Sequence, residues 1–364
     1  MWIPAEARDG FLTVSHADAG TEINPMNEEL KAMFDCLARG KAAYLPSKFW
    51  EKLNTKNLGQ LDDEGIGNFK RTIATNYFTW VVGILDPQFR YLIRKMKITD
   101  WPRLLKGVFT IDESSSLPRI RQVELSLFTR MLWTLAERTD SLGLMAEIEE
   151  PALGNPFKIH LGGKLISQDI ANSLLEFYSI REVFSPPRSE RFTIAELGAG
   201  YGRTAHVFLK AFPRCRYIIV DIPPALYVAQ NYLTRIFPKR KAFRFRAFQE
   251  IGEVITEMDT SDIVFLLPHQ AEMLEKNAVH LFINISSLHE MTRDQIALYL
   301  KMIDRLTDGY FYTKQWKVSV NPFDKISIHF NDYPIPDGWV ELYLRTPRVQ
   351  VSFFEAIYRI PGLA

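Results

Sequence analysis

The chain has 364 residues, enough to bury a large core, and its 44 lysines and arginines balance 43 aspartates and glutamates. This near-zero net charge argues against a nucleic-acid-binding protein and against a charged, unstructured tail. Neither of the two cysteines, Cys36 and Cys215, has the spacing of a zinc site or a disulfide framework. Acids near the N-terminus and short apolar stretches predict neither a signal peptide nor a membrane span, so we expect a cytoplasmic protein.

Residues 1–150 carry helical rather than strand patterning and predict a mainly helical N-terminal region. Its clearest helix is expected at 119–138, and a second helix at 68–85. The stretch 140–156, rich in glycine and proline, marks the predicted boundary with a second domain at 151–364. We expect the helical region to act as a lid over an acceptor or as a dimerisation surface, which leaves a homodimer open. Polar residues on it that suit a lid, or equally a solvated helix face, are Asn68, Lys70, Arg71 and Asn76.

Strands and helices alternate in the second domain. A strand at 192–197, a helix at 203–212 and a strand at 216–220 are followed by a helix that begins after Pro223-Pro224. Thr292 and Gln295 form a capping box that opens a later helix. Further strands are expected at 243–247, 263–267, 281–285, 310–313, 325–329 and 351–358. This alternation predicts an α/β fold, a Rossmann-like doubly wound sheet with helices on both faces, in which either 243–247 or 263–267 is the third strand.

A glycine turn joins the first two predicted elements of this sheet. It reads Glu196-Leu-Gly198-Ala199-Gly200-Tyr-Gly202-Arg203, and Asp221 ends the next strand. Glycines let a backbone turn tightly and approach a ligand, a helix N-terminus offers free N–H groups, and an acid at the next strand end can bind a ribose diol. We therefore expect a nucleotide cradle. A dinucleotide site would need one more residue between the last two glycines, and a tight turn that binds nothing is the alternative.

This turn resembles the first motif of class I S-adenosylmethionine-dependent methyltransferases. The resemblance implies S-adenosyl-L-methionine as the cofactor, with Glu196 and the glycines beneath its amino-acid part and Asp221 on its ribose hydroxyls. Several segments are similar to the sugar O-methyltransferase family of bacterial polysaccharide and natural-product gene clusters: Gly154-Asn-Pro156, Ile166-Ser-Gln-Asp169, Glu196 to Arg203, Asp221 to Leu233, Leu266-Leu-Pro-His-Gln270 and Asn284 to Met291. This similarity implies methyl transfer to a hydroxyl of a sugar or glycosylated metabolite. Alternatives are N-methylation of an amino sugar, an NAD-dependent oxidoreductase and a non-catalytic partner-binding protein.

The segment Leu288-His289-Glu290 follows the predicted strand 281–285, where strand ends face the ligand crevice. In small-molecule O-methyltransferases a Leu-His-Asp segment at this place carries the catalytic base, so the resemblance implies a base at His289 or Glu290. The imidazole of His289 titrates near neutral pH. Glu290 could orient His289, act as the base itself or bind a substrate hydroxyl. The alternative is that Glu290 caps the next helix and His289 is a solvated loop residue.

Other polar residues near the strand ends are candidate ligands of the cofactor. Arg203 could bind the cofactor carboxylate or lie at the surface. His269 and Gln270 could contact adenine or substrate, or belong to an ordinary loop. Asn284 lies in an apolar strand, so its amide needs partners, which could be the cofactor or the protein. The remaining cofactor-binding candidates from these motifs are Ala199, Ile222 and Ser286.

Aromatic and polar residues also gather late in the chain, where they suit an acceptor wall or, more simply, the edge of the sheet. They are Trp316, Asn321, Phe323, His329, Asn331, Asp332 and Tyr333. No tight spacing of aspartate, glutamate and histidine indicates a metal site, so no metal is expected.

Overall fold

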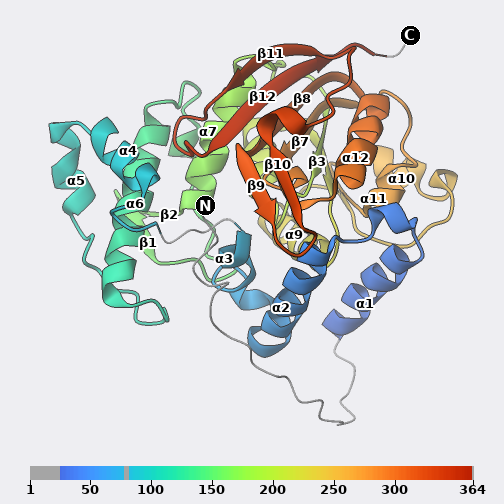
Figure 1. Cartoon of the computed structure of the whole chain (residues 1–364). Helices are drawn as coiled ribbons and strands as arrows, with labels where there is room; N and C mark the ends of the chain where they lie inside the picture. The colour runs from blue at the N-terminus through green and yellow to red at the C-terminus, as the bar shows by residue number, and fades with distance from the viewer. Residues whose placement is uncertain (1–24, 78–81, 363–364) are drawn as a thin grey trace.

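The computed structural model describes residues 25–77 and 82–362 (Figure 1). Its helices are α1 Pro25–Ala38, α2 Lys48–Glu64, α3 Ile73–Tyr77, α4 Pro87–Lys95, α5 Trp101–Leu105, α6 Arg119–Glu137, α7 Gln168–Arg181, α8 Arg203–Ala211, α9 Ala225–Ile236, α10 Ile255–Asp259, α11 Pro268–Ala271 and α12 Arg293–Leu306. Its strands are β1 Ile159–Leu161, β2 Lys164–Ile166, β3 Thr193–Leu197, β4 Arg216–Val220, β5 Ala242–Phe243, β6 Ile263–Leu266, β7 Val279–Ile285, β8 Thr307–Trp316, β9 Val318–Asn321, β10 Ile326–His329, β11 Val340–Arg345 and β12 Phe353–Ile360.

An eight-stranded sheet, in the order β11-β12-β8-β7-β3-β4-β6-β5, lies at the centre of the molecule. The strands from β8 to β5 run parallel, and β12 and β11 form an antiparallel hairpin beside β8. The chain leaves β3 toward β4 on one side and returns to β7 on the other side. This reversal confirms the predicted doubly wound arrangement and makes the carboxyl ends of β3 and β7 the topological switch point, where ligands bind in such sheets.

The two candidates for the third strand take different places. Strand β6 lies beside β4, whereas β5 is a two-residue strand at the edge. The sequences explain this order: Ile263–Leu266 is apolar throughout, as a strand covered on both faces must be. In 243–247, exposed Arg244 and Arg246 alternate with buried phenylalanines, a pattern that suits an edge.

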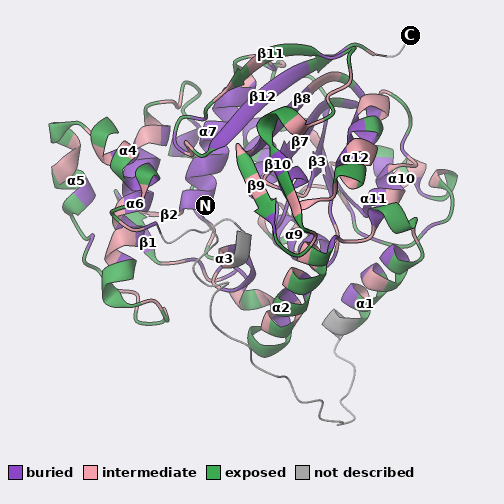
Figure 2. Ribbon diagram, in the orientation of Figure 1, coloured by how far each residue is buried: buried purple, intermediate pink, exposed green. Residues whose placement is uncertain are grey.

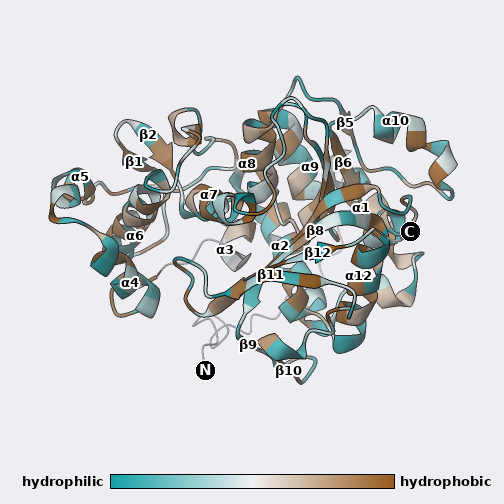
Figure 3. Ribbon diagram, turned by 90° about the horizontal axis from the view of Figure 1, so that it is seen from above, coloured by the Kyte–Doolittle hydropathy of each residue, from teal (hydrophilic) through white to brown (hydrophobic). Residues whose placement is uncertain are grey.

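Each face of the sheet builds its own core. Ile194, Tyr217 and Ile283 pack with α7, α8 and α9 on one face. Ala195, Ile218 and Phe282 pack with α12 on the other. The alternation follows the two-residue period of a strand. Figure 2 shows the central strands and α7 as buried, and Figure 3 shows brown and teal stretches on flanking helices such as α12, as expected for helices with one face on the core.

The N-terminal region is mainly helical, as predicted, although not in every detail. Helix α6 confirms the expected helix at 119–138. The expected helix at 68–85 is wrong over most of its described parts, because only 73–77 is α-helical and residues 83–86 form a turn; residues 78–81 lie outside the described residues. Lys70 and Arg71 there form buried ion pairs with Glu150 and Asp112 instead of facing solvent along a regular helix.

One hydrophobic core includes residues from both sides of the predicted boundary near residue 150. Trp133 of α6 and Phe177 of α7 belong to the same cluster, together with Phe69 and Tyr201. Figure 1 places α4, α5 and α6 to one side of the sheet and α1 and α2 below it. Cys36 and Cys215 are buried free thiols. Within residues 25–77 and 82–362, no helix combines the length and apolarity needed to cross a membrane.

Candidate active site

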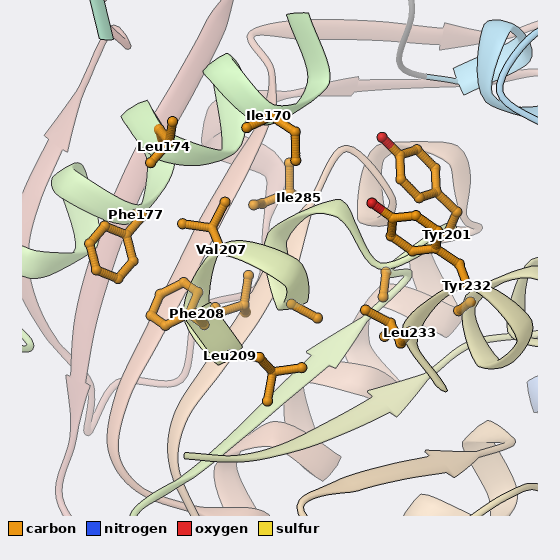
Figure 4. Packing of buried hydrophobic residues seen from close by; sticks show 14 of the residues in the cluster. Ile170, Leu174, Phe177, Tyr201, Val207, Phe208, Leu209, Tyr232, Leu233 and Ile285 are labelled. Carbon is orange, nitrogen blue, oxygen red and sulfur yellow. The ribbon is translucent and has the colours of Figure 1, made fainter. Parts of the chain in front are cut away.

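The glycine turn lies at the switch point between β3 and α8. Gly198, Gly200 and Gly202 all have positive φ, at 71°, 60° and 87°. A Cβ atom on Gly198 would lie 2.3 Å from Ser287 Oγ, and one on Gly202 would lie 2.7 Å from Leu233 Cδ1. The first glycine therefore lets the turn approach the loop after β7, and the third lets α8 pack against α9. Figure 4 shows Leu233 among the side chains packed around this turn.

Asp221 ties the glycine turn to the end of β4. Its Oδ2 accepts a hydrogen bond from Gly200 N and its Oδ1 accepts one from Ile222 N, both at 2.8 Å. Burial raises the pKa of this carboxyl to about 7, although the two backbone N–H groups lower it. Because each carboxylate oxygen has a second lone pair, Asp221 can also accept hydrogen bonds from a ligand's hydroxyls.

A pocket of about 720 Å³, counted with its open mouth, lies at this edge of the sheet. Its lining residues come from the turn, the β4 and β7 ends, α12 and the N-terminal region: Tyr44, Leu45, Pro46, Ser47, Trp50, Leu197, Gly198, Gly200, Asp221, Ile222, Ala225, Pro268, Ser286, Ser287, Glu290, Met291, Gln295 and Tyr299. The sequence-predicted residues that it brings together are Gly198, Gly200, Asp221, Ile222, Ser286 and Glu290.

The loop after β7 turns His289 and Glu290 in different directions. His289 is only 3% exposed and does not line the pocket. Its Nδ1 lies 2.9 Å from Gln315 Oε1, and its Nε2 lies 3.7 Å from Glu290 Oε1. Burial lowers the pKa of His289 to about 4, so the imidazole is neutral at neutral pH. Since Gln315 Oε1 can only accept, His289 carries its proton on Nδ1 and turns an unprotonated Nε2 toward Glu290.

Glu290 is the member of this pair that faces the pocket. Its side chain is 21% exposed. Burial raises the pKa of its carboxyl well above the ordinary value, and the charge of Asp221 adds to the rise. Its backbone oxygen accepts a hydrogen bond from Ser47 Oγ at 3.1 Å. The two acids therefore share one pocket, and the charge of Asp221 opposes the ionisation of Glu290.

Asn284 holds the loop that carries this pair. Its Nδ2 donates to Leu197 O at 2.9 Å and to Ser287 Oγ at 3.2 Å, and its Oδ1 accepts from Leu288 N at 3.3 Å. Gln315 Nε2 donates to the same Oδ1. Of the two roles weighed for this buried amide, the structural one accounts for its bonds. It joins β3, the loop and β8 beneath the pocket.

Glu196 and Arg203, the two ionisable residues that flank the glycine turn, do not line the pocket. Glu196 is buried under the turn, where its Oε2 accepts from Tyr217 Oη at 2.7 Å, and burial raises its pKa to about 8. Arg203 donates to Ser173 Oγ at 2.7 Å and forms a buried ion pair with Glu176 at 2.6 Å. Neither lines the pocket, and the same holds for Ala199 and Gly202.

His269 and Gln270 follow β6, and they hold their own neighbourhood together. His269 Nε2 lies 3.6 Å from Cys36 Sγ of α1. Gln270 accepts from Leu267 N at 3.0 Å and donates to Arg246 O at 2.9 Å. The pocket wall at this point is Pro268 instead. The side chains that follow this strand therefore pack within the protein.

The roof of the pocket comes from residues that the sequence analysis did not single out. Residues 44–47 and Trp50 form it, ahead of and within the first turn of α2. Gln295 Nε2 donates to Leu45 O at 2.7 Å, and Asp324 accepts from Lys48 N and Phe49 N, both at 3.2 Å. The only local signal was Ser47, which caps α2.

The residues proposed for a lid and an acceptor wall lie elsewhere. Lys70 pairs with Glu150, and Arg71 with Asp112. Asn68 accepts a hydrogen bond from Asn155 at 2.7 Å; the side chain of Asn76 lies outside the description. None of the late aromatic and polar residues lines the pocket, although Asn321 binds Asp324 at 2.8 Å and so supports the roof. In the described ranges no three side chains of histidine, cysteine, aspartate or glutamate gather as metal ligands would.

No family model matches this chain, and no curated protein matches it. Solved structures that resemble it include the PH0226 protein of Pyrococcus horikoshii OT3, at 14% identity over 51% of this chain and 91% of that one, with a TM-score of 0.34. A SAM-dependent methyltransferase of Aquifex aeolicus has 14% identity over 50% and 93%, with a TM-score of 0.31. The 1,6-didemethyltoxoflavin-N1-methyltransferase of Burkholderia thailandensis has 15% identity over 47% and 72%, with a TM-score of 0.33.

Proposed function

We propose that this chain is an S-adenosylmethionine-dependent methyltransferase that acts on a hydroxyl of a small molecule. The observation that carries the proposal is one pocket at the switch point that joins the glycine turn, Asp221 and the carboxyl of Glu290. The motif resemblance supports the cofactor. For the acceptor, it favours a sugar or a glycosylated metabolite.

The residues in the pocket fit this cofactor. Asp221 has free lone pairs for two ribose hydroxyls. Tyr44, Ile222, Pro268 and Tyr299 provide apolar surface for a purine. The close approach of Gly198 to Ser287 leaves no space for a side chain, so the backbone itself forms the floor beneath the ligand.

The bound cofactor supplies an electrophilic methyl group for an in-line displacement. A sugar hydroxyl is a weak acid, so the protein must remove its proton as the new bond forms. We assign this role to Glu290, because it faces the pocket and its raised pKa makes its carboxylate a stronger base than an ordinary one. His289 is a positioning residue, since its Nε2 lies behind Glu290 and its Nδ1 is fixed by Gln315.

Calorimetry and a transfer assay test this proposal. Wild-type protein should bind S-adenosylmethionine and not NADH. With the methyl-tritiated cofactor it should label members of a panel of monosaccharides, methyl glycosides and nucleotide sugars. Binding of NADH without binding of S-adenosylmethionine would overturn the proposal. Labelling confined to amino sugars, and lost when their amine is acetylated, would replace O-methylation by N-methylation.

A further inference from the structure

Among the residues that the structure describes, the charged side chains that line the pocket are both acidic. Among the described residues that line it, only Asp221 and Glu290 carry a charge, and none is lysine, arginine or histidine. The roof contributes Tyr44, Ser47 and Trp50, and α12 contributes Gln295 and Tyr299, all uncharged. A pocket lined by two acidic side chains and no basic side chain favours a cationic ligand.

The neighbours of Glu290 do not neutralise it. His289, 3.7 Å away, is uncharged near neutral pH because burial lowers its pKa to about 4. In the described part of the chain, Asp221 and Tyr333 also interact with this carboxyl, and neither supplies positive charge. Lys41 is paired with Glu272 and Arg293 with Asp332, each outside the lining. An ionised Glu290 therefore meets its counter-ion only when a positively charged ligand enters.

We infer that Glu290 makes this pocket selective for the cationic sulfonium cofactor over its neutral thioether product. The inference rests on the proposed function and deepens it. A carboxylate in a partly dry pocket attracts a sulfonium but gains nothing from a thioether, because a charge in low dielectric is stabilised mainly by an opposite charge. Cofactor binding should therefore favour ionised Glu290 and release a proton, whereas product binding should leave that carboxyl protonated.

The chemical step removes both charges together. Glu290 takes the proton of the acceptor hydroxyl while the O–CH₃ bond forms and the S–CH₃ bond breaks. The electron pair of the S–CH₃ bond stays on sulfur. A carboxylate and a sulfonium become a carboxylic acid and a thioether, and the acceptor becomes a methyl ether. The attraction that held the cofactor is gone after one turnover, so the same residue that removes the proton also promotes product release.

Calorimetry with S-adenosylmethionine and S-adenosylhomocysteine tests the inference on the full chain. In wild-type protein we expect the sulfonium to bind roughly tenfold or more tightly than the thioether, in line with a partly screened ion pair. Glu290→Gln should weaken S-adenosylmethionine binding by about that factor and change S-adenosylhomocysteine binding less than about twofold. Proton release, measured in buffers of different ionisation enthalpy, should accompany wild-type binding of the sulfonium and disappear in the variant.

The matched control is Glu257→Gln in α10, whose carboxylate pairs with Arg246 at 2.6 Å outside the lining. It should change neither affinity. Binding of the thioether reports that the variants are folded. Equal weakening of both ligands in Glu290→Gln, or an unchanged ratio, would overturn the inference and leave the proposed function standing. If wild-type protein bound neither ligand, both would fall.

Discussion

Gly198 is the residue at which the glycine turn closely approaches the loop after β7, so an added Cβ atom would push the two apart. Its φ of 71° is costly for any other residue, and an added Cβ would lie 2.3 Å from Ser287 Oγ. Gly198→Ala should therefore displace the loop that carries Ser286 and Glu290. We expect a more than tenfold loss of cofactor affinity, about 1.4 kcal/mol, by calorimetry. Gly252→Ala, whose Cβ would meet nothing within 4 Å, should leave the affinity unchanged.

Asp221 serves two purposes at once, which gives its removal a large effect. Asp221→Ala deletes the hydrogen bond from Gly200 N and the carboxylate assigned to the ribose. Cofactor affinity should fall by one to two orders of magnitude, about 1.4–2.8 kcal/mol, in calorimetric titrations. Unchanged binding would show that this carboxylate does not hold the ribose.

The different placement of Glu290 and His289 predicts different kinetic effects. At saturating cofactor, Glu290→Gln should lower kcat by about 10²- to 10⁴-fold, as expected for loss of a general base. His289→Gln should lower kcat less. It should shift the limb of the kcat–pH profile that rises with pH, since His289 Nε2 lies 3.7 Å from the Glu290 carboxyl. These rates are measured with any acceptor that the panel identifies. A Glu290→Gln rate within threefold of wild type would remove Glu290 as the base.

Strand β3, in the middle of the sheet, contains a buried glutamate, Glu196. Burial raises the pKa of Glu196 from 4.5 to about 8. The folded state thus keeps a proton that the unfolded chain releases, so this residue makes the fold less stable as pH rises from about 4.5 to about 8. Glu196→Gln does not titrate, and its amide oxygen can still accept from Tyr217 Oη.

The melting temperature of Glu196→Gln relative to wild type should therefore increase with pH across that window in scanning calorimetry. Other titrating groups are common to both proteins, so they cancel in the difference. A difference that stayed flat with pH, or that fell as pH rose, would contradict a raised pKa at this position.

The elements also show how far local sequence patterns extend. The β3 turn, Asp221 and the β7 loop were predictable because strand ends, glycines and acids form a short-range pattern. Helix α7 was not predicted, although Asp169, Asn172, Ser173 and Glu176 recur at helical spacing along one face. The structure buries this polar face too, and Glu176 there pairs with Arg203. The burial of His289 depends on Gln315, 26 residues away on β8. The roof depends on hydrogen bonds of Ser47 and Leu45 with Glu290 and Gln295, more than 240 residues later. Tertiary contacts of this length leave no local signal in the sequence.

Across the whole molecule, Lys70 connects the helical region to the glycine turn. Its side chain is only 4% exposed, and its Nζ forms a buried ion pair with Glu150. The same Nζ lies 4.6 Å from the ring centroid of Tyr232 and 5.7 Å from that of Tyr201. Tyr201 belongs to the turn and Tyr232 to α9; Figure 4 shows the two side by side. The N-terminal region therefore contacts the glycine turn through Lys70 and also supplies the roof of the pocket.

This connection predicts that the helical region and the sheet unfold together. Lys70→Met leaves the Glu150 charge buried without its partner, which costs about 3–5 kcal/mol. We expect one calorimetric transition in wild type, and one transition several degrees lower in the variant. Lys158→Met, a control at an exposed lysine 4.0 Å from Asp112, should melt as wild type does. Lys70→Met/Glu150→Gln should recover part of the loss, because the uncompensated charge is gone. Two separate transitions, with only one moved by Lys70→Met, would show that the two regions fold independently.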